Sequence, residues 1–229
     1  MSYSKATQEL FDDWATRGRA EGMERGHRVR AFRALEEMPI TTGDRLLDLG
    51  CGNGWATRWL REQAGPTGRA VGIDVSEEML ARARAASDGI AGLSFQAEAF
   101  DALPWDEASF DHAFSMEALY YAPDLGAALE SIARVLRVDG TLTVCIDFYE
   151  ENPYSASWPE LLGLSMQRLS QDGWCTALEL AGFTVDASFR CLDPRPVDAG
   201  LPEEERRNEE IFRREIGSLA IRGRRRELS

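Results

Sequence analysis

The chain has 229 residues, of which 44% are hydrophobic, which is enough for one well-buried α/β domain and hardly enough for two. Its formal net charge of −13 repels phosphate backbones and argues against DNA or RNA as the substrate. No run of eighteen apolar residues is present, and the first residues, MSYSKATQEL, show no signal pattern. We therefore expect a soluble cytoplasmic protein with no nucleic-acid and no membrane partner.

The first segment, residues 4–38, has the apolar spacing of one or two amphipathic helices. The spacing is broken near Gly18 and Gly22, which predicts interruptions at these two positions. The cysteines and histidines follow no metal-binding spacing, since the four cysteines form no C-x-x-C pair and the two histidines form no H-E-x-x-H pair. We expect reduced cysteines and no metal ion.

Strands and helices alternate after residue 43. The apolar runs predict strands at residues 45–49, 70–74, 93–98, 110–116 and 141–148, each separated from the next by a helix or a connecting segment. Such alternation requires right-handed crossovers and a parallel, doubly wound sheet. Leucine and isoleucine recur at helical spacing before the fifth strand, at positions 125, 129, 132 and 136.

The pattern changes after the fifth strand. Helical segments extend to Leu180 and end at Gly182. Residues 183–192 alternate as a strand, 203–214 form a charged helix, and 218–224 form a short last strand. No role is assigned to the charged helix.

A glycine-rich turn follows the first predicted strand. Gly50, Gly52 and Gly54 alternate within the run LLDLGCGNGWATRWL, residues 46–60. Glycine permits positive φ and leaves no Cβ between the chain and a ligand, so the alternation indicates close approach of a nucleotide-like cofactor. A dinucleotide fingerprint would need glycine at position 55, which is Trp55. NAD-linked oxidoreduction is therefore the minor alternative.

An acid closes the second predicted strand. Asp74 lies twenty positions after Gly54, where a carboxylate can accept both hydroxyls of a ribose that lies across the glycine turn. The alternative is that Asp74 only caps the following helix, whose start is marked by Ser76 and by the acids at positions 77 and 78.

Three stretches carry a resemblance to a known family. The G-x-G-x-G turn, with Asp48 two residues upstream, resembles motif I of the class I S-adenosylmethionine (SAM) dependent methyltransferases. The segment FQAEAFDALPWDEASFDHAFSMEALYYAPD, residues 95–124, resembles the adenine-contacting segment, the LPF-like turn and the strand that follow in that family. RVLRVDGTLTV, residues 134–144, resembles its helix end, turn and fifth strand.

The resemblance implies a Rossmann-like methyltransferase fold of class α/β. It consists of a doubly wound, seven-stranded, mostly parallel sheet with an antiparallel seventh strand and an N-terminal helical lid. In this chain the lid corresponds to residues 1–42 and the SAM-binding methyltransferase domain to residues 43–229, within a single globular domain overall.

The same resemblance implies a set of cofactor-binding residues. Glu98 stands where many members of the family have Asp, and its alternative role is that of a solvated acid at a strand end. Met79 either packs on the adenine ring or belongs to the core. The implied SAM-binding residues are Asp48, Gly50, Cys51, Gly52, Asn53, Gly54, Asp74, Val75, Met79, Glu98, Ala99, Ser115 and Met116.

Candidate catalytic residues follow from the chemistry of methyl transfer. The cofactor supplies the reactivity and the protein supplies alignment, so a base is needed only when the nucleophile must lose a proton. Glu117 and Tyr121 follow the fourth predicted strand, and His27 would approach the acceptor if the N-terminal helices close over the sheet. The alternatives are a solvated helix histidine and tyrosines that only pack under the lid.

These patterns predict an enzyme that transfers a methyl group from SAM to a small-molecule acceptor and releases S-adenosylhomocysteine. The resemblance is to methyltransferase type 11, the branch that includes quinone and sterol methyltransferase-like enzymes. One alternative is a tRNA or protein methyltransferase, which would require a basic or docking surface that the charge balance does not show. Another is a SAM-binding protein without catalysis.

Overall fold

A single sheet runs through the centre of the protein in the computed structural model, which describes residues 5–227. Within those residues seven strands are ordered β3-β2-β1-β4-β5-β7-β6. The pairs β1–β2, β2–β3, β1–β4 and β4–β5 are parallel, and β7 is antiparallel to both of its neighbours. The predicted doubly wound, mostly parallel sheet with an antiparallel seventh strand is confirmed. Residues 1–4 and 228–229, the outer ends of the predicted lid and domain, lie outside the described residues.

The strands lie close to their predicted positions. They are β1 (Arg45–Leu49), β2 (Arg69–Asp74), β3 (Leu93–Ala97), β4 (Phe110–Met116), β5 (Leu136–Ile146), β6 (Phe183–Cys191) and β7 (Ser218–Arg225). The largest difference is in β5, which begins at Leu136 rather than at Thr141. The residues between them form an irregularity in which Asp139 takes a φ of 64°, so the segment expected as a turn is absorbed into the strand.

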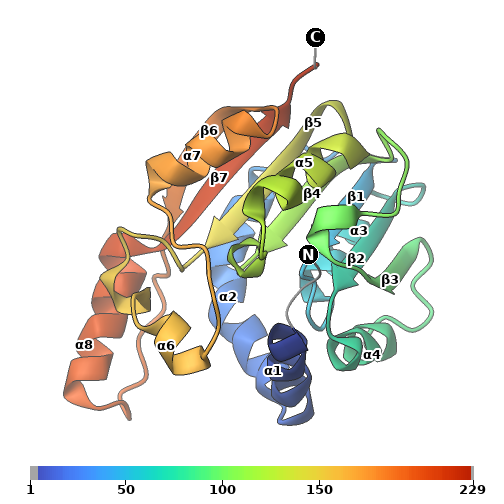
Figure 1. The fold of residues 1–229 in the computed structure, drawn as a ribbon. Coiled ribbons are helices and arrows are strands. Elements are labelled where there is room, and N and C mark those ends of the chain that lie inside the picture. The colour runs from blue at the N-terminus through green and yellow to red at the C-terminus, as the bar shows by residue number, and fades with distance from the viewer. Residues whose placement is uncertain (1–4, 228–229) are drawn as a thin grey trace.

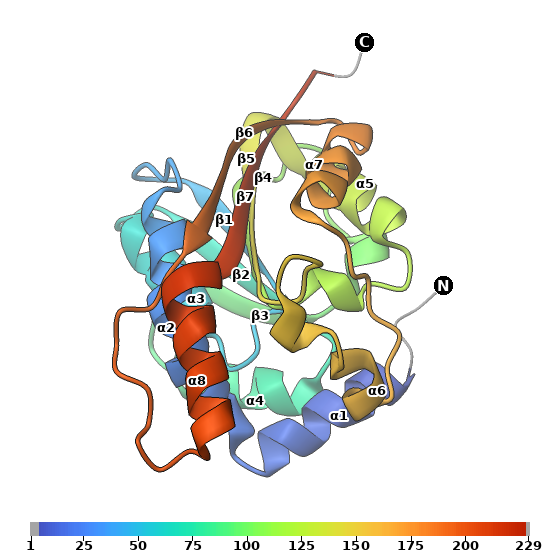
Figure 2. The same ribbon diagram turned by 90° about the vertical axis from the view of Figure 1, so that its left-hand side faces the viewer.

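Helices cover both faces of the sheet, with α2 and α3 on one side and α5 and α7 on the other (Figure 2). Their bounds are α1 (Lys5–Thr16), α2 (Arg19–Glu36), α3 (Trp55–Gln63), α4 (Glu77–Ala85), α5 (Leu125–Val135), α6 (Trp158–Leu162), α7 (Gln171–Leu180) and α8 (Glu203–Ile211). The predicted break at Gly18 is confirmed, because Gly18 has left-handed φ between α1 and α2. The break at Gly22 is wrong, since α2 runs through it. The charged helix ends earlier than predicted and continues as a π-helical turn, Phe212–Ile216.

Two apolar layers hold these helices on the sheet. On the α5 side, Leu129 and Ile132 are fully buried against the strands, as their spacing predicts. On the α2 side, the small residues Ala31 and Ala34 let that helix approach the sheet closely. None of the described helices combines the length and apolarity that a membrane span requires.

The N-terminal helices are fastened across the end of the sheet where the parallel strands terminate. Helix α1 lies there beside α4 (Figure 1). The Ser76 hydroxyl donates to Asp12 of α1 at 2.5 Å, and Arg82 of α4 pairs with Glu21 of α2 at 2.8 Å. Carboxyl ends of parallel strands are where ligands bind in such sheets, so these helices cover the expected site.

Candidate functional site

The glycine turn after β1 takes a conformation that requires glycine. Gly50, Gly52 and Gly54 have φ of 74°, 52° and 76°. A Cβ on Gly50 would lie 2.2 Å from the Cβ of Ala118, and one on Gly54 would lie 2.8 Å from the Phe95 ring. A Cβ on Gly52 would meet no atom within 4 Å, because this residue borders open space. Two of the glycines therefore allow close packing, and the middle one leaves room for a ligand.

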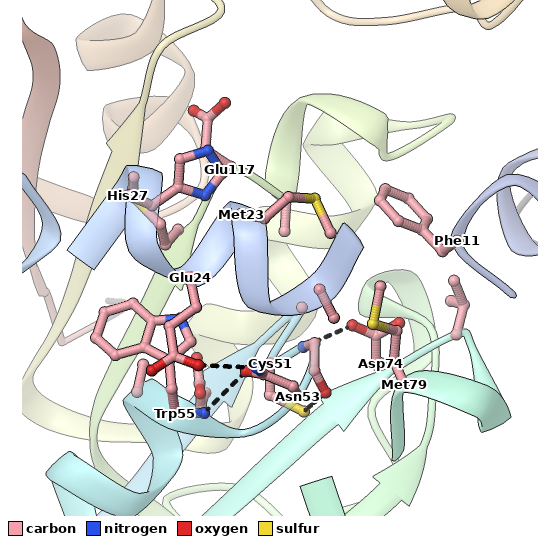
Figure 3. Close-up of a pocket in the computed structure, with 18 of the residues that line it drawn as sticks. Phe11, Met23, Glu24, His27, Cys51, Asn53, Trp55, Asp74, Met79 and Glu117 are labelled. Carbon is pink, nitrogen blue, oxygen red and sulfur yellow. Dashed lines mark hydrogen bonds between the residues drawn. The ribbon is translucent and has the colours of Figure 1, made fainter. Parts of the chain in front are cut away.

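One cavity lies between this turn and the lid helices (Figure 3). Nine of the residues predicted to bind the cofactor line it, and so do all three candidate catalytic residues. The nine are Asp48, Gly50, Cys51, Gly52, Asn53, Asp74, Val75, Met79 and Met116, and the three are His27, Glu117 and Tyr121. The remaining four, Gly54, Glu98, Ala99 and Ser115, lie outside the lining. The Ser115 hydroxyl is buried and donates to the Leu49 carbonyl oxygen at 3.1 Å. A direct contact of these four with SAM stays a prediction.

Several lining residues carry no motif in the sequence. Met23 and Glu24 come from α2, and Phe11 comes from α1. The Asn53 side-chain amide donates to the Glu24 carboxylate at 2.9 Å, which connects the glycine turn to the lid (Figure 3). Such contacts depend on how the lid docks, and no local spacing indicates them.

Asp74 braces the glycine turn. One of its carboxylate oxygens accepts from the Gly52 backbone N–H at 2.9 Å and the other from the Ser76 N–H at 3.0 Å. The N-cap of α4 is Ser76, whose hydroxyl accepts from the Met79 N–H at 3.1 Å, so helix capping does not account for Asp74. Burial raises the pKa of Asp74, against the lowering effect of these backbone donors.

A second acid, Asp48, lies beneath the same turn at the end of β1. It is 2% exposed and accepts a hydrogen bond from the Thr57 hydroxyl at 2.6 Å. Burial raises the pKa of Asp48 to about 7, the Asp74 carboxyl adds to the shift, and the hydrogen bond from Thr57 opposes it. The cavity floor therefore gains a negative charge near neutral pH.

A cluster of polar side chains closes the other end of the cavity. Ligand atoms of His27, Glu117 and Asp147 all lie within 4.8 Å of one another, a spacing that would suit a metal ion. Both oxygens of Asp147 are engaged, however. Arg30 donates to one at 2.7 Å and the Ser218 hydroxyl donates to the other. A guanidinium thus already neutralises this cluster, and a metal ion would have to displace it.

Burial shifts the titration of both pocket-facing members of the cluster. It lowers the pKa of His27, against the raising effect of Asp147. It raises the pKa of Glu117 well above its usual range, and the neighbouring Asp147 carboxylate adds to this shift. Burial also raises the pKa of Tyr121, whose hydroxyl therefore stays protonated at neutral pH. The shifts favour a neutral imidazole and a protonated carboxyl at this end of the cavity.

Comparison with known proteins identifies the family. The family model described as "Methyltransferase domain" matches residues 40–173, more than half of the chain. The chain belongs to this methyltransferase family. A Haloferax volcanii methyltransferase, solved in complex with the Trm112 methyltransferase activator, is 38% identical with a TM-score of 0.87, and the match covers 95% of this chain and 98% of that one.

Two further relatives are informative. An S-adenosylmethionine dependent methyltransferase from Mesorhizobium loti is 25% identical with a TM-score of 0.66, covering 84% of this chain and 96% of that one. The demethylmenaquinone methyltransferase of Lactococcus lactis is 35% identical over 123 residues, 53% of this chain and 48% of the relative. This methyltransferase spans half or less of the length of the first curated relatives that it matches.

The cofactor of these methyltransferases is S-adenosylmethionine, and the cavity fits it. Gly52 leaves an open cradle where a side chain would otherwise project. Asp74 closes the neighbouring strand with acceptor oxygens on the cavity wall, and Asp48 supplies negative charge below. Both acids suit a cofactor that carries ribose hydroxyls and positively charged groups.

Proposed function

We propose that this methyltransferase transfers the methyl group of SAM to a small-molecule acceptor bound under the lid. The observation that supports the proposal is that the N-terminal helix α1 covers the acceptor end of the cavity. Phe11 of α1 packs edge-on against Tyr121 with ring centroids 5.1 Å apart, so the acceptor end of the cavity has an aromatic roof. Tyr121 is only 6% exposed. Both rings line the cavity, so a bound acceptor would contact aromatic side chains.

In this proposal each part of the cavity has a separate role. Asp74 would hold the ribose hydroxyls, Met79 and Phe100 would pack near the adenine, and the glycine turn would accept the rest of the cofactor. SAM supplies an activated methyl group when bound, and the protein supplies alignment. Alignment alone can contribute roughly 7 to 11 kcal/mol to lowering such a barrier. His27, Glu117 and Tyr121 would surround the acceptor.

Two further observations support a small acceptor. The net charge of −13 disfavours a nucleic-acid surface, and no nucleic-acid partner is predicted. The Lactococcus relative is named for demethylmenaquinone, which is a small molecule. The cytoplasmic location stays a prediction.

The acceptor class is tested by labelling. The purified protein is incubated with methyl-labelled SAM and an extract of its own cells that has been divided into small-molecule, RNA and protein fractions. We expect label in the small-molecule fraction. Label confined to RNA or protein would overturn the proposal, and tight SAM binding with no transfer to any fraction would favour a non-catalytic binding protein.

Asp74 is tested separately by calorimetry with S-adenosylhomocysteine. Loss of the carboxylate in Asp74→Ala should weaken binding by at least tenfold, since a charge-assisted hydrogen bond contributes about 1.5 to 3 kcal/mol. Asp88→Ala is the matched control, because Asp88 is exposed and lies outside the cavity. Equal affinity of the two variants would refute the assignment of Asp74 to the cofactor.

A second candidate function follows from the similarity to the Haloferax protein, which extends over 95% of this chain. We propose as the alternative that this chain also binds a Trm112-type activator and methylates RNA or protein within that complex. Copurification with a coexpressed Trm112 protein from the same genome, followed by the fractionated labelling assay, tests it. Transfer to a macromolecule only in the presence of the partner would favour this alternative over the small-molecule acceptor.

A further inference from the structure

The polar end of the cavity contains one side chain that can accept a proton and another that can donate a hydrogen bond. His27 comes from α2 and Glu117 from the segment after β4, and both line the cavity (Figure 3). A ring nitrogen of His27 and a carboxyl oxygen of Glu117 lie within 4.8 Å of each other. Among residues 5–227 no group forms a hydrogen bond with the His27 ring, so its nitrogens are available to a ligand.

Glu117 is held in place at a conformational cost. Its φ of 55° lies in the left-handed region, which is uncommon for residues other than glycine. Its backbone N–H donates to the Cys145 carbonyl oxygen at 3.0 Å. One carboxyl oxygen accepts from the Tyr120 hydroxyl at 2.8 Å and the other from the Asp147 N–H. Strain that surrounding contacts maintain in this way is frequent at functional sites.

Burial is the main influence that favours the uncharged forms of the pair. The groups that face it are Asp147 from the end of β5, Arg30 from α2, and the phenols of Tyr120 and Tyr121. Burial lowers the pKa of His27, and burial together with Asp147 raises the pKa of Glu117. When the pKa of a histidine is lowered and that of a neighbouring carboxyl is raised, the histidine can accept a proton and the carboxyl can donate a hydrogen bond.

The helix that carries His27 is fastened on both sides of it. One turn further along, Arg30 donates to Ser218 and to Asp147, each at 2.7 Å. Two residues earlier, the Arg25 carbonyl oxygen accepts a hydrogen bond from Arg195 at 3.0 Å. Arg195 is itself held by the Asp193 carboxylate at 2.6 Å, and Asp193 is fully buried. These contacts fix the position of the imidazole relative to Glu117.

We propose that the acceptor is an uncharged hydroxyl compound of the phenol or enol class, with His27 as its base, Glu117 as a hydrogen-bond donor, and Arg30 and Arg195 as positioning residues. The inference rests on the proposed function. The apolar wall made by Phe11, Met23 and Tyr121 suits a ring.

The reaction balances without a further reactant. The acceptor O–H proton passes to a ring nitrogen of His27. An electron pair of that oxygen, or of the carbon conjugated with it, forms the bond to the methyl carbon, while the carbon–sulfur bond breaks with its electrons remaining on sulfur. The products are the methylated acceptor, a neutral thioether and a protonated histidine, which returns its proton to solvent. The Glu117 carboxyl donates a hydrogen bond to the oxygen that develops negative charge.

Proton transfer is measured without turnover, using 4-nitrophenol as the probe and the protein saturated with S-adenosylhomocysteine. Absorbance of the phenolate reports its ionisation against pH. We expect bound probe to ionise at lower pH than probe in buffer. His27→Gln should reduce the ionised fraction at least tenfold, and Glu117→Gln, which keeps a donor, should reduce it less than tenfold. An unperturbed probe, equal spectra of His27→Gln and wild type, or a signal abolished by EDTA would overturn the inference.

Matched variants separate the parts of the proposal. Arg195→Ala should shift ionisation of the probe toward higher pH, whereas Arg224→Ala, which removes an exposed partner of Asp186, should not. Identical pH curves for these two variants would overturn the positioning role. Calorimetry with S-adenosylhomocysteine is run on every variant. Retained cofactor binding with an unperturbed probe would refute only the acceptor class, and loss of cofactor binding by the wild-type protein would refute the proposed function.

Discussion

Asp48→Asn should make the cofactor-free protein more stable, and increasingly so as the pH rises. The folded protein raises the pKa of this buried carboxyl from an ordinary 3.8 to about 7. A carboxyl whose pKa is higher in the folded state contributes stability at low pH that is lost as the pH rises toward the folded pKa. The full penalty for ionising Asp48 is about 4 kcal/mol. Between about pH 5.5 and 8.5 the part that develops is about 2 kcal/mol.

Urea unfolding at several pH values measures this effect. Asparagine can still accept the Thr57 hydrogen bond, so any fixed cost of the substitution is the same at each pH, and the slope of the stability difference is the readout. Asp106→Asn, on the exposed surface, is the control and should show no such slope. A stability difference between Asp48→Asn and wild type that stays constant across this pH range would refute the assignment of a buried, titrating carboxyl.

Three other predictions concern the turn and the lid. Gly50→Ala should cost about 2 to 4 kcal/mol in urea unfolding, because its Cβ would lie 2.2 Å from Ala118, whereas Gly89→Ala has positive φ but no neighbour within 4 Å and should cost only about 1 to 2. Similar costs would refute the close approach. Glu24→Ala should accelerate release of S-adenosylhomocysteine up to about tenfold in stopped-flow measurements, since the Asn53 contact with the lid is lost; an unchanged release rate would show that this contact does not retain the cofactor. Asp147→Asn should lower the pH at which Glu117 loses its proton, because the Asp147 carboxylate raises the pKa of Glu117, whereas Tyr120→Phe should raise that pH, because the hydrogen bond from the Tyr120 hydroxyl lowers the pKa. Infrared titration of the carboxyl measures both shifts, and shifts in the same direction would contradict this account.

The sheet and the glycine turn could be predicted because their signals are local. The parallel strands follow from alternating apolar runs, and the position of Asp74 at a strand end follows from a spacing of twenty residues. The antiparallel last strand was implied only by the resemblance to the methyltransferases. The start of β5 could not be predicted in this way. Its Val-Asp-Gly segment has turn composition, and only pairing with β4 on one side draws the residues before it into the sheet.

The lid contacts could not be predicted because they join segments distant in sequence. Glu24 and Asn53 are 29 residues apart, and Arg195 reaches a carbonyl oxygen 170 residues away. His27 was singled out as one of two histidines, but nothing in its neighbourhood indicated Arg30 or Asp147 as its surroundings. The hydrogen bond from the buried Ser115 hydroxyl to the Leu49 carbonyl oxygen likewise depends on the pairing of two strands that are distant in sequence.

The two lid helices, α1 and α2, are held in place by contacts of different strength. This difference determines how the cofactor and the acceptor enter and leave the cavity. An outward movement of α2 would separate Arg30 from Asp147. The buried carboxylate would then lack its counter-charge, which costs several kcal/mol. Helix α1 is joined to α2 through the left-handed Gly18, and its contacts include the Phe11–Tyr121 ring pair and a partly buried hydrogen bond between Asp12 and Ser76. Opening of the cavity therefore costs least free energy when α1 rotates about Gly18 while α2 stays in place. The rate at which ligands enter and leave should then depend on the backbone flexibility of Gly18.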